Sequence, residues 1–423
     1  MTHSSTHQPN VSFYGLGIAP KILEVLERMK FTVPTPIQHK AIPIATEGKD
    51  IIAVAQTGTG KTLAFAIPVI QRLSQGKGNC LVLVPTRELA IQVDETFQKL
   101  APLFGMRSTV VIGGASMQLQ IQALRKNPRI IIATPGRLVD HINERNIMLA
   151  FINILVLDEA DRMLDMGFQP QIEHILKYIS KNRQTMLFSA TIPPEIIKIG
   201  TAHMRLPINI EIAPSGTVAE RVIQELFIVN RDLKRKLLEK ILGQYKGSVL
   251  LFTRTKIGAA KITRFIRGIG YSAAEIHSNR SLGQRKEALE GFKTGRYRVL
   301  VATDIASRGI DVTGIELVVN YDLPEDSENY VHRIGRTARA GHEGRAISFA
   351  TPDQKDDIKN IERITKAALP ISRHPGFAAE SFTSHQGSLP KSSHHRGNSY
   401  KKNYRGQRRF GSHFQRPKAA YPQ

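Results

Sequence analysis

A glycine-rich loop that ends in lysine and threonine is the first stretch whose residues could do chemistry. It covers 55–62 and lies between an apolar run at 51–54 and a helix-like run at 63–73. Glycines let backbone N–H groups turn toward an anion, and a helix start adds positive potential. Lys61 could reach the outer phosphates of a nucleotide, and the Thr62 hydroxyl could hold Mg²⁺. An ordinary glycine-rich turn is the alternative, but spacing and flanking elements favour a phosphate-binding loop. The residues expected to cradle the phosphates are Ala55, Gln56, Thr57, Gly58, Thr59, Gly60, Lys61 and Thr62.

Two adjacent carboxylates follow a six-residue run, 152–157, that is typical of a buried parallel strand. They are Asp158 and Glu159, and they open an acidic tetrad that ends at Asp161. Ligands of open α/β sheets bind beyond the carboxyl ends of strands, so we expect both carboxylates to face the phosphate loop. Asp158 could anchor Mg²⁺, largely through water, and Glu159 could orient or deprotonate the attacking water. The alternative is a solvated helix start, because acids favour helix N-termini.

The bulk composition limits the class of protein. The 423 residues are enough for two or three domains, and 59 Lys and Arg against 36 Asp and Glu give a formal charge of +23. This excess predicts a polyanionic partner, either nucleic acid or an anionic membrane surface. No apolar run approaches a bilayer span, and the first ten residues lack an apolar signal core. A single cysteine, Cys80, excludes an internal disulfide framework and fits a reducing compartment. We therefore expect a cytoplasmic protein without membrane association, in which Cys80 is a buried structural thiol.

Strand-like runs alternate with helix-like stretches along most of the chain. They lie near 51–54, 81–84, 109–112, 130–133, 154–157 and 185–188, and then near 225–229, 248–252, 299–302, 317–320 and 346–350. Such alternation is typical of doubly wound parallel sheets, one in each half. The expected fold class is α/β, with an N-terminal domain over 1–206, a linker over 207–220, a C-terminal domain over 221–370 and a tail over 371–423.

The last 53 residues have a different composition from the rest. They carry ten Lys and Arg but one acid, Glu380, and few aliphatic residues, so they cannot bury enough apolar surface to fold alone. Aromatic side chains alternate with cations over 400–414. Cations for phosphates and rings for bases suit single-stranded nucleic acid, whereas the alternative is a tail that only aids solubility. We expect a disordered basic tail that contacts nucleic acid.

From 13 to 349 the chain resembles the DEAD-box ATP-dependent RNA helicases of superfamily 2, and within them the bacterial RhlE-like group. Beside the phosphate loop and the acidic tetrad, the matching motifs lie at 34–38, 85–89, 113–114, 134–137, 189–191, 252–254, 302–311 and 332–339. The resemblance implies two RecA-like domains that bind ATP, Mg²⁺ and RNA. It also implies RNA-stimulated ATP hydrolysis coupled to domain closure, with local unwinding of short RNA duplexes or remodelling of RNA–protein complexes.

The resemblance also assigns residues to the nucleotide. Gln38 carries an amide that can pair with the edge of adenine, and the family uses this glutamine to select ATP. Phe13 resembles the adenine-stacking aromatic, although a core phenylalanine is the alternative. Asp311 resembles the acid that meets the ATP ribose and helps to close the cleft. Arg336 and Arg339 resemble arginine fingers that reach across the cleft, and they complete a catalytic set with Lys61 and Glu159.

Further family positions point to RNA and to coupling. The residues expected to grip RNA are Arg87, Gly114, Thr134, Arg137, Arg254, Thr303 and Asp304. The residues expected to link hydrolysis to strand opening are Asp161, Ser189, Thr191 and His332. Short hydroxyls, glycine amides and arginines position a backbone without reading sequence, so we expect little sequence preference.

Two positions depart from the family pattern. Lys30 stands where the family usually has glycine, which should alter only a turn. Leu282 stands where a Gln-x-x-Arg motif has glutamine, although Arg285 keeps its register; this weakens an RNA-side or bracing contact.

The sequence leaves the wider role open. Similar proteins act on ribosomal precursors, in RNA degradation or in the cold response, and a monomer is the default expectation. Two other classes of function compete with the helicase: an ATP-gated RNA clamp whose turnover is incidental, and a DNA translocase.

Overall fold

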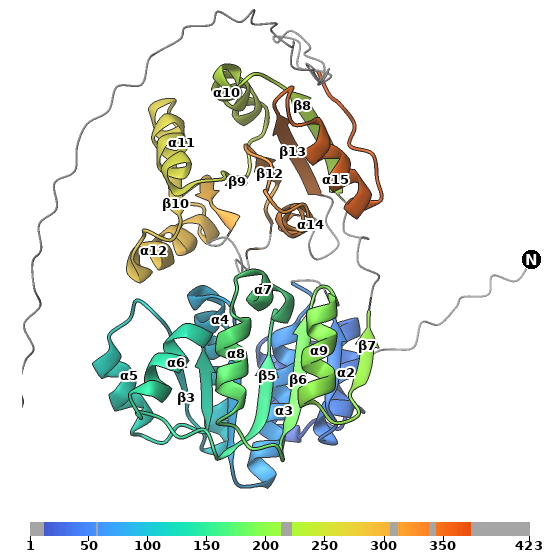
Figure 1. Cartoon of the computed structure of the whole chain (residues 1–423), viewed down its shortest axis with the longest axis vertical. Coiled ribbons are helices and arrows are strands. Elements are labelled where there is room, and N and C mark those ends of the chain that lie inside the picture. The colour runs from blue at the N-terminus through green and yellow to red at the C-terminus, as the bar shows by residue number, and fades with distance from the viewer. Residues whose placement is uncertain are drawn as a thin grey trace, which may run out of the picture. The chain divides into compact units, whose positions relative to one another are not determined.

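The computed structural model describes residues 12–55, 58–212, 222–304, 312, 314–337 and 344–373 (Figure 1). These residues form two α/β lobes, each built on one parallel sheet. The expected fold class is therefore confirmed. The expected tail over 371–423 lies outside the described residues except for its first three, as does the expected linker from 213 onward. None of the described helices is long and apolar enough to cross a membrane.

The first sheet has strand order β3-β4-β2-β5-β6-β1-β7. Its strands are β1 (Ile51–Val54), β2 (Asn79–Leu83), β3 (Ser108–Val111), β4 (Ile130–Ala133), β5 (Ile152–Leu157), β6 (Gln184–Ser189) and β7 (Ile208–Glu211). Its helices are α1 (Pro20–Arg28), α2 (Pro36–Thr46), α3 (Lys61–Gln75), α4 (Arg87–Leu100), α5 (Met117–Leu124), α6 (Pro135–Asn143), α7 (Ala160–Asp165), α8 (Gln169–Leu176) and α9 (Pro194–His203). Where the strand order of such a sheet reverses, the loops at the carboxyl ends of neighbouring strands lead to opposite faces and leave a crevice in which a ligand can bind.

Helices cover both faces of this sheet. Figure 1 shows α6, α8 and α9 in front of the strands, and α3 lies behind them. Side chains of α2, α3 and α4 pack in one buried cluster, and those of α6, α8 and α9 pack in another on the opposite face. Successive residues of β1 enter different clusters, because neighbouring strand side chains point to opposite faces. Cys80 is fully buried in β2, as expected, and burial raises the pKa of its thiol.

The second sheet has strand order β10-β11-β9-β12-β13-β8. Its strands are β8 (Val222–Ile228), β9 (Val249–Phe252), β10 (Ala273–Ile276), β11 (Val299–Ala302), β12 (Leu317–Asn320) and β13 (Gly344–Ala350). Its helices are α10 (Lys234–Gln244), α11 (Lys256–Gly268), α12 (Leu282–Lys293), α14 (Glu328–Ile334) and α15 (Lys355–Thr365). The cluster on one face contains α12, α14 and α15, and the cluster on the other contains α10 and α11.

Two strands and two boundaries differ from the sequence expectation. The linker expected over 207–220 begins too early, because β7 pairs in parallel with β1 as the edge strand of the first sheet. A single hydrophobic pair, Ile208 and Ile210, gave too short a pattern to recognise. β10 was also missed, since Ala273 and Ala274 are weak strand formers and pairing with β11 decides their conformation. Ile371, expected to open the tail, still forms a bridge to Leu226 of β8.

Candidate active site and RNA groove

The phosphate loop is shaped by a glycine that no other residue could replace without strain. Gly60 has φ 87° directly before α3, and a Cβ there would lie 2.4 Å from Nε2 of Gln38. Lys61 is buried, and its Nζ donates to the Ala55 carbonyl at 3.0 Å across the loop. The amine is therefore held at the place where a phosphate chain would lie. Gln56 and Thr57 lie outside the described residues.

The side chain of Gln38 is hydrogen-bonded to the phosphate loop. Its Oε1 accepts from the Thr35 N–H at 2.9 Å, and its Nε2 donates to the Gly60 carbonyl at 3.1 Å. Both ends of the amide thus bond to backbone groups. Adenine recognition by Gln38 stays a prediction, because the amide would have to exchange these bonds for bonds to adenine. Phe13 is 3% exposed in the core beside α1 and α3, which is the alternative weighed for it.

The paired carboxylates lie where β5 ends, and their surroundings drive their pKa values apart. Burial, partly offset by Lys61, raises the pKa of Asp158 to about 7. Burial would raise the pKa of Glu159 as well, but Arg162, Lys61 and Arg336 outweigh it and lower that pKa to about 2. Lys61 thus offsets only part of the burial of Asp158, whereas three cations act on Glu159. The two adjacent carboxylates therefore lie in different electrostatic surroundings, which allows them to have different roles.

The donor set fits a magnesium ion that keeps most of its own ligands. Among the described residues there is no group of three or more His, Cys, Asp or Glu that could hold a metal. One buried carboxylate, Asp158, and the Thr62 hydroxyl are the protein donors expected near the phosphates. Mg²⁺ commonly takes one or two protein oxygens and completes its shell with water and substrate phosphates.

The residues expected to couple hydrolysis to strand opening do come together. Asp161 Oδ2 accepts from the N–H groups of Ala190 and Thr191, both at 2.9 Å, and from the Thr191 hydroxyl at 3.0 Å. The Asp161 N–H donates to the Ser189 hydroxyl at 3.2 Å. The start of α7 is thereby tied to the loop after β6.

Two residues from the second lobe complete this cluster of charges. His332 lies close enough to Arg162 and Asp161 for their charges to act on it, and burial, reinforced by Arg162, lowers the pKa of His332 to about 3. Arg336 is 2% exposed, and its Nε donates to the His332 carbonyl at 3.1 Å. Arg336 also contributes to the low pKa of Glu159. Arg339 and Asp311 lie outside the described residues.

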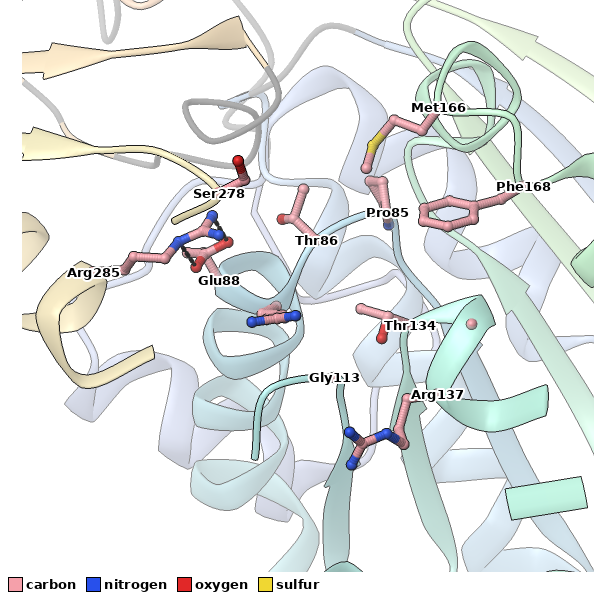
Figure 2. A pocket seen from close by; sticks show the side chains of 12 residues that line it. Pro85, Thr86, Glu88, Gly113, Thr134, Arg137, Met166, Phe168, Ser278 and Arg285 are labelled. Carbon is pink, nitrogen blue, oxygen red and sulfur yellow. Dashed lines mark hydrogen bonds and ion pairs between the residues drawn. The ribbon is translucent and has the colours of Figure 1, made fainter. Parts of the chain in front are cut away.

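A cavity of about 290 Å³ contains most of the N-terminal residues expected to grip RNA (Figure 2). Arg87, Thr134 and Arg137 line it. Gly114 does not, but Gly113, the residue directly before it, does. Gly114 has φ 76°, and a Cβ there would clash with the Arg87 guanidinium, so glycine lets that arginine approach the loop. The complete lining is Pro85, Thr86, Arg87, Glu88, Gly113, Thr134, Gly136, Arg137, Met166, Phe168, Ser278 and Arg285.

Met166 and Phe168 form an apolar wall of this cavity that sequence reasoning missed. Figure 2 shows both side chains among those that line the cavity. They flank Gly167, which has φ 74° and turns the chain between α7 and α8. Two large apolar residues around a turn glycine were the available signal. A cavity with arginines on one wall and an apolar side chain on the other suits the phosphates and bases of a single strand.

None of the three second-lobe residues expected to grip RNA lines this cavity: Arg254, Thr303 and Asp304. The Asp304 carboxylate is held on both oxygens by Arg333, with Nε–Oδ1 at 2.5 Å and Nη2–Oδ2 at 2.8 Å. That geometry makes Asp304 a brace for α14. The Arg254 N–H donates to Asp322 at 3.1 Å, so its backbone is fixed while its side chain is partly exposed.

Arg285 keeps its family register and is paired with Glu88. The guanidinium meets both carboxylate oxygens at 2.7 Å, as Figure 2 shows. Burial raises the pKa of Glu88 despite this partner. Leu282, one turn before Arg285, packs against the apolar cluster that contains α4. The glutamine of the family pattern is thus replaced here by an apolar contact beside a buried ion pair.

Comparison with known proteins agrees with this geometry. A DEAD/DEAH box helicase model matches residues 35–199, and a helicase conserved C-terminal domain model matches residues 233–341. The ATP-dependent rRNA helicase RRP3 of Debaryomyces hansenii is 42% identical over 371 residues, which are 87% of this chain and 78% of the relative. RRP3 of Saccharomyces cerevisiae is 43% identical over 364 residues, with coverages of 85% and 73%.

A solved structure supports the same assignment. Dbp5 of S. cerevisiae, bound to RNA and ADP BeF3, is 30% identical with a TM-score of 0.76, covering 86% of this chain and 95% of that one. The chain therefore belongs to the DEAD-box family of ATP-dependent RNA helicases.

Proposed function

We propose that this helicase hydrolyses ATP only when its two lobes close over one RNA strand, and that closure bends the strand and opens short duplexes or remodels RNA–protein complexes. One observation carries the proposal: the buried Glu159 carboxylate lies under the charge of Lys61 from its own lobe and of Arg336 from the other. A reaction centre that needs charges from both lobes is incomplete when they separate. Binding of RNA to both lobes then becomes coupled to turnover.

Magnesium is the proposed metal. When bound, it would supply charge neutralisation between the phosphates of ATP. Asp158 and the Thr62 hydroxyl would hold it, while Lys61 binds the outer phosphates and Glu159 orients the attacking water. Arg336, with Arg339 proposed beside it, would stabilise charge on the transferring phosphoryl group.

The wider role is a further proposal. The relatives named rRNA helicase suggest ribosomal precursor RNA as the substrate, and the positive charge of the chain suits such a target. RNA degradation, cytoplasmic location, a monomeric state and membership of the RhlE-like group remain hypotheses. The basic, aromatic-containing tail motivates that subgroup, whereas the relatives reported above are yeast proteins.

The test compares ATP turnover by the whole chain with single-stranded RNA, with DNA of the same sequence and without nucleic acid. We expect stimulation by RNA, weak or no stimulation by DNA, and ATP-dependent separation of a short RNA duplex over many turnovers. Equal stimulation by DNA would instead support a translocase. One burst followed by a stalled, RNA-bound protein would support the clamp.

Glu159→Gln supplies the matched control for this test. The amide keeps the size of the carboxylate but cannot accept a proton, so we expect ATP binding to persist while hydrolysis falls by about 10²–10⁴-fold. The measurement is affinity for ATP beside the single-turnover rate. Unchanged turnover would remove Glu159 from the reaction.

A further inference from the structure

Arg162 is a buried charge that neither the sequence nor the proposed chemistry accounts for. Its side chain, in the short helix α7, is 2% exposed and is among the largest fully buried side chains of the described residues. Arginine is almost never buried to this degree without a partner. Its partner is the residue expected to orient the attacking water: Nη1 of Arg162 donates to Oε2 of Glu159 at 2.5 Å.

The backbone on either side of this pair is held in place. Glu159 has φ 52° and ψ 50°, a left-handed conformation that is unfavourable for a non-glycine residue. The Arg162 N–H donates to Oδ1 of Asp161 at 2.9 Å, and Oδ2 of Asp161 is bonded to the loop that contains Thr191. The backbone of Arg162 is therefore fixed, so its guanidinium can hold the carboxylate of Glu159, whose own backbone conformation is unfavourable. Strain of this kind is concentrated at functional sites.

The pair is a poor candidate for a purely stabilising contact. Within the described residues, Nε of Arg162 has no hydrogen-bond partner although it is buried. A buried ion pair with an unmade hydrogen bond gives little net stability, because desolvation offsets the attraction. Its position, at a carboxylate on which the charge of Lys61 also acts, suits a role in the reaction.

The alternative partner of Glu159 explains what that role is. Lys61 is another cation of the same lobe whose charge acts on Glu159. The Nζ of Lys61 donates to the Ala55 carbonyl in this structure, and we expect it to bind phosphate when ATP is present. A carboxylate that swung to Lys61 would occupy this amine and leave the position that faces the attacking water.

We propose that Arg162 is a positioning residue for ATP hydrolysis, which holds one oxygen of Glu159 so that the carboxylate faces the attacking water and stays off Lys61. This inference rests on the proposed function, and it adds a residue that acts through its bond to Glu159. Loss of Arg162 should then act on kcat through Glu159, and a misplaced catalytic group can lower a rate by as much as about 10²-fold.

The experiment compares Arg162→Gln and Arg162→Lys with wild type for RNA-stimulated kcat, for the KM of ATP and for affinity for a non-hydrolysable ATP analogue. We expect Arg162→Gln to lower kcat by roughly 10–100-fold with analogue affinity changed less than about 3-fold, and Arg162→Lys to recover part of the rate. Arg183→Gln is the matched control. Arg183 is a half-buried arginine of the same lobe that donates to the carbonyls of Ser180 and His203, so its loss should affect stability rather than kcat.

A double-mutant cycle separates positioning from structure. If Arg162 acts through Glu159, adding Arg162→Gln to Glu159→Gln should change the residual single-turnover rate less than about 2-fold, because the two effects are not additive. A full additional loss in that background overturns the proposal, as does an unchanged kcat in Arg162→Gln alone. A wild-type chain without RNA-stimulated turnover would reject the proposed function itself.

Discussion

At the scale of single residues, environment decides which chemistry a side chain can do. Asp158 and Glu159 are neighbours with the same functional group, yet their pKa values lie at about 7 and about 2. The acidic tetrad allowed both roles to be predicted from the sequence, because a strand followed by two acids places them beside the phosphate loop. Arg162, which does most to lower the pKa of Glu159, could not be predicted, since nothing in its spacing distinguishes a buried arginine from a solvated one.

The RNA cavity gives a prediction at this scale, because its walls differ in chemistry. Phe168→Ala removes apolar contact, so we expect RNA affinity to fall by about 1–3 kcal/mol with an unchanged dependence on salt. Arg87→Ala removes one phosphate contact, so the slope of log affinity against log salt should shrink by about 0.7. Binding titrations at several salt concentrations measure both effects. If Phe168→Ala changed the slope as much as Arg87→Ala, or left affinity intact, the apolar wall would not contact RNA.

At the scale of elements, helix ends show how local rules place the site residues. α4 begins at Arg87 because Oγ1 of Thr86 accepts from the Leu89 N–H at 3.2 Å. α1 ends in a glycine-type cap, in which the Phe31 N–H bonds to the Leu26 carbonyl and the Lys30 N–H to the Glu27 carbonyl, both at 2.8 Å. Lys30 takes the left-handed position of this cap with φ 62°. The departure from the family glycine lies in a turn, where it places a non-glycine residue in a left-handed conformation.

Lys30→Gly should accordingly stabilise the protein. Relief of the left-handed strain outweighs the added freedom of the unfolded chain, for a gain of about 0.5–1 kcal/mol in the free energy of unfolding. Lys240→Gly is the control, because Lys240 is an exposed residue in the interior of α10 and should lose about 1 kcal/mol. Urea unfolding of both variants against wild type measures the difference. A loss of stability in Lys30→Gly would show that the cap is not strained.

At the scale of the whole molecule, the site is assembled from residues far apart in the chain. The phosphate loop follows β1, the carboxylates follow β5, and Ser189 ends β6. All lie at the carboxyl ends of parallel strands of one sheet, so the motif positions and the strand pattern together were enough to predict that they meet. His332 and Arg336 come from the second lobe, and both interact electrostatically with Glu159.

What could not be predicted at this scale was the choice of partner by each side chain. Gln38 bonds to Gly60, Asp304 bonds to Arg333, and Glu88 bonds to Arg285. Each partner comes from a different element, and tertiary packing rather than local sequence sets the distance between them. The edge strand β7 was missed for the same reason, since its pairing with β1 rather than its composition makes it a strand.

The central claim is that ATP held by the first lobe becomes reactive only when Arg336 of the second lobe reaches it. The most direct test is the RNA-stimulated, single-turnover rate of ATP hydrolysis by Arg336→Ala, measured beside its affinity for a non-hydrolysable ATP analogue. We predict a fall in rate on the order of 10³-fold or more, as for loss of an arginine finger, with the analogue still bound. A fall of only a few-fold would contradict the account, because the reaction centre would then be complete within the first lobe.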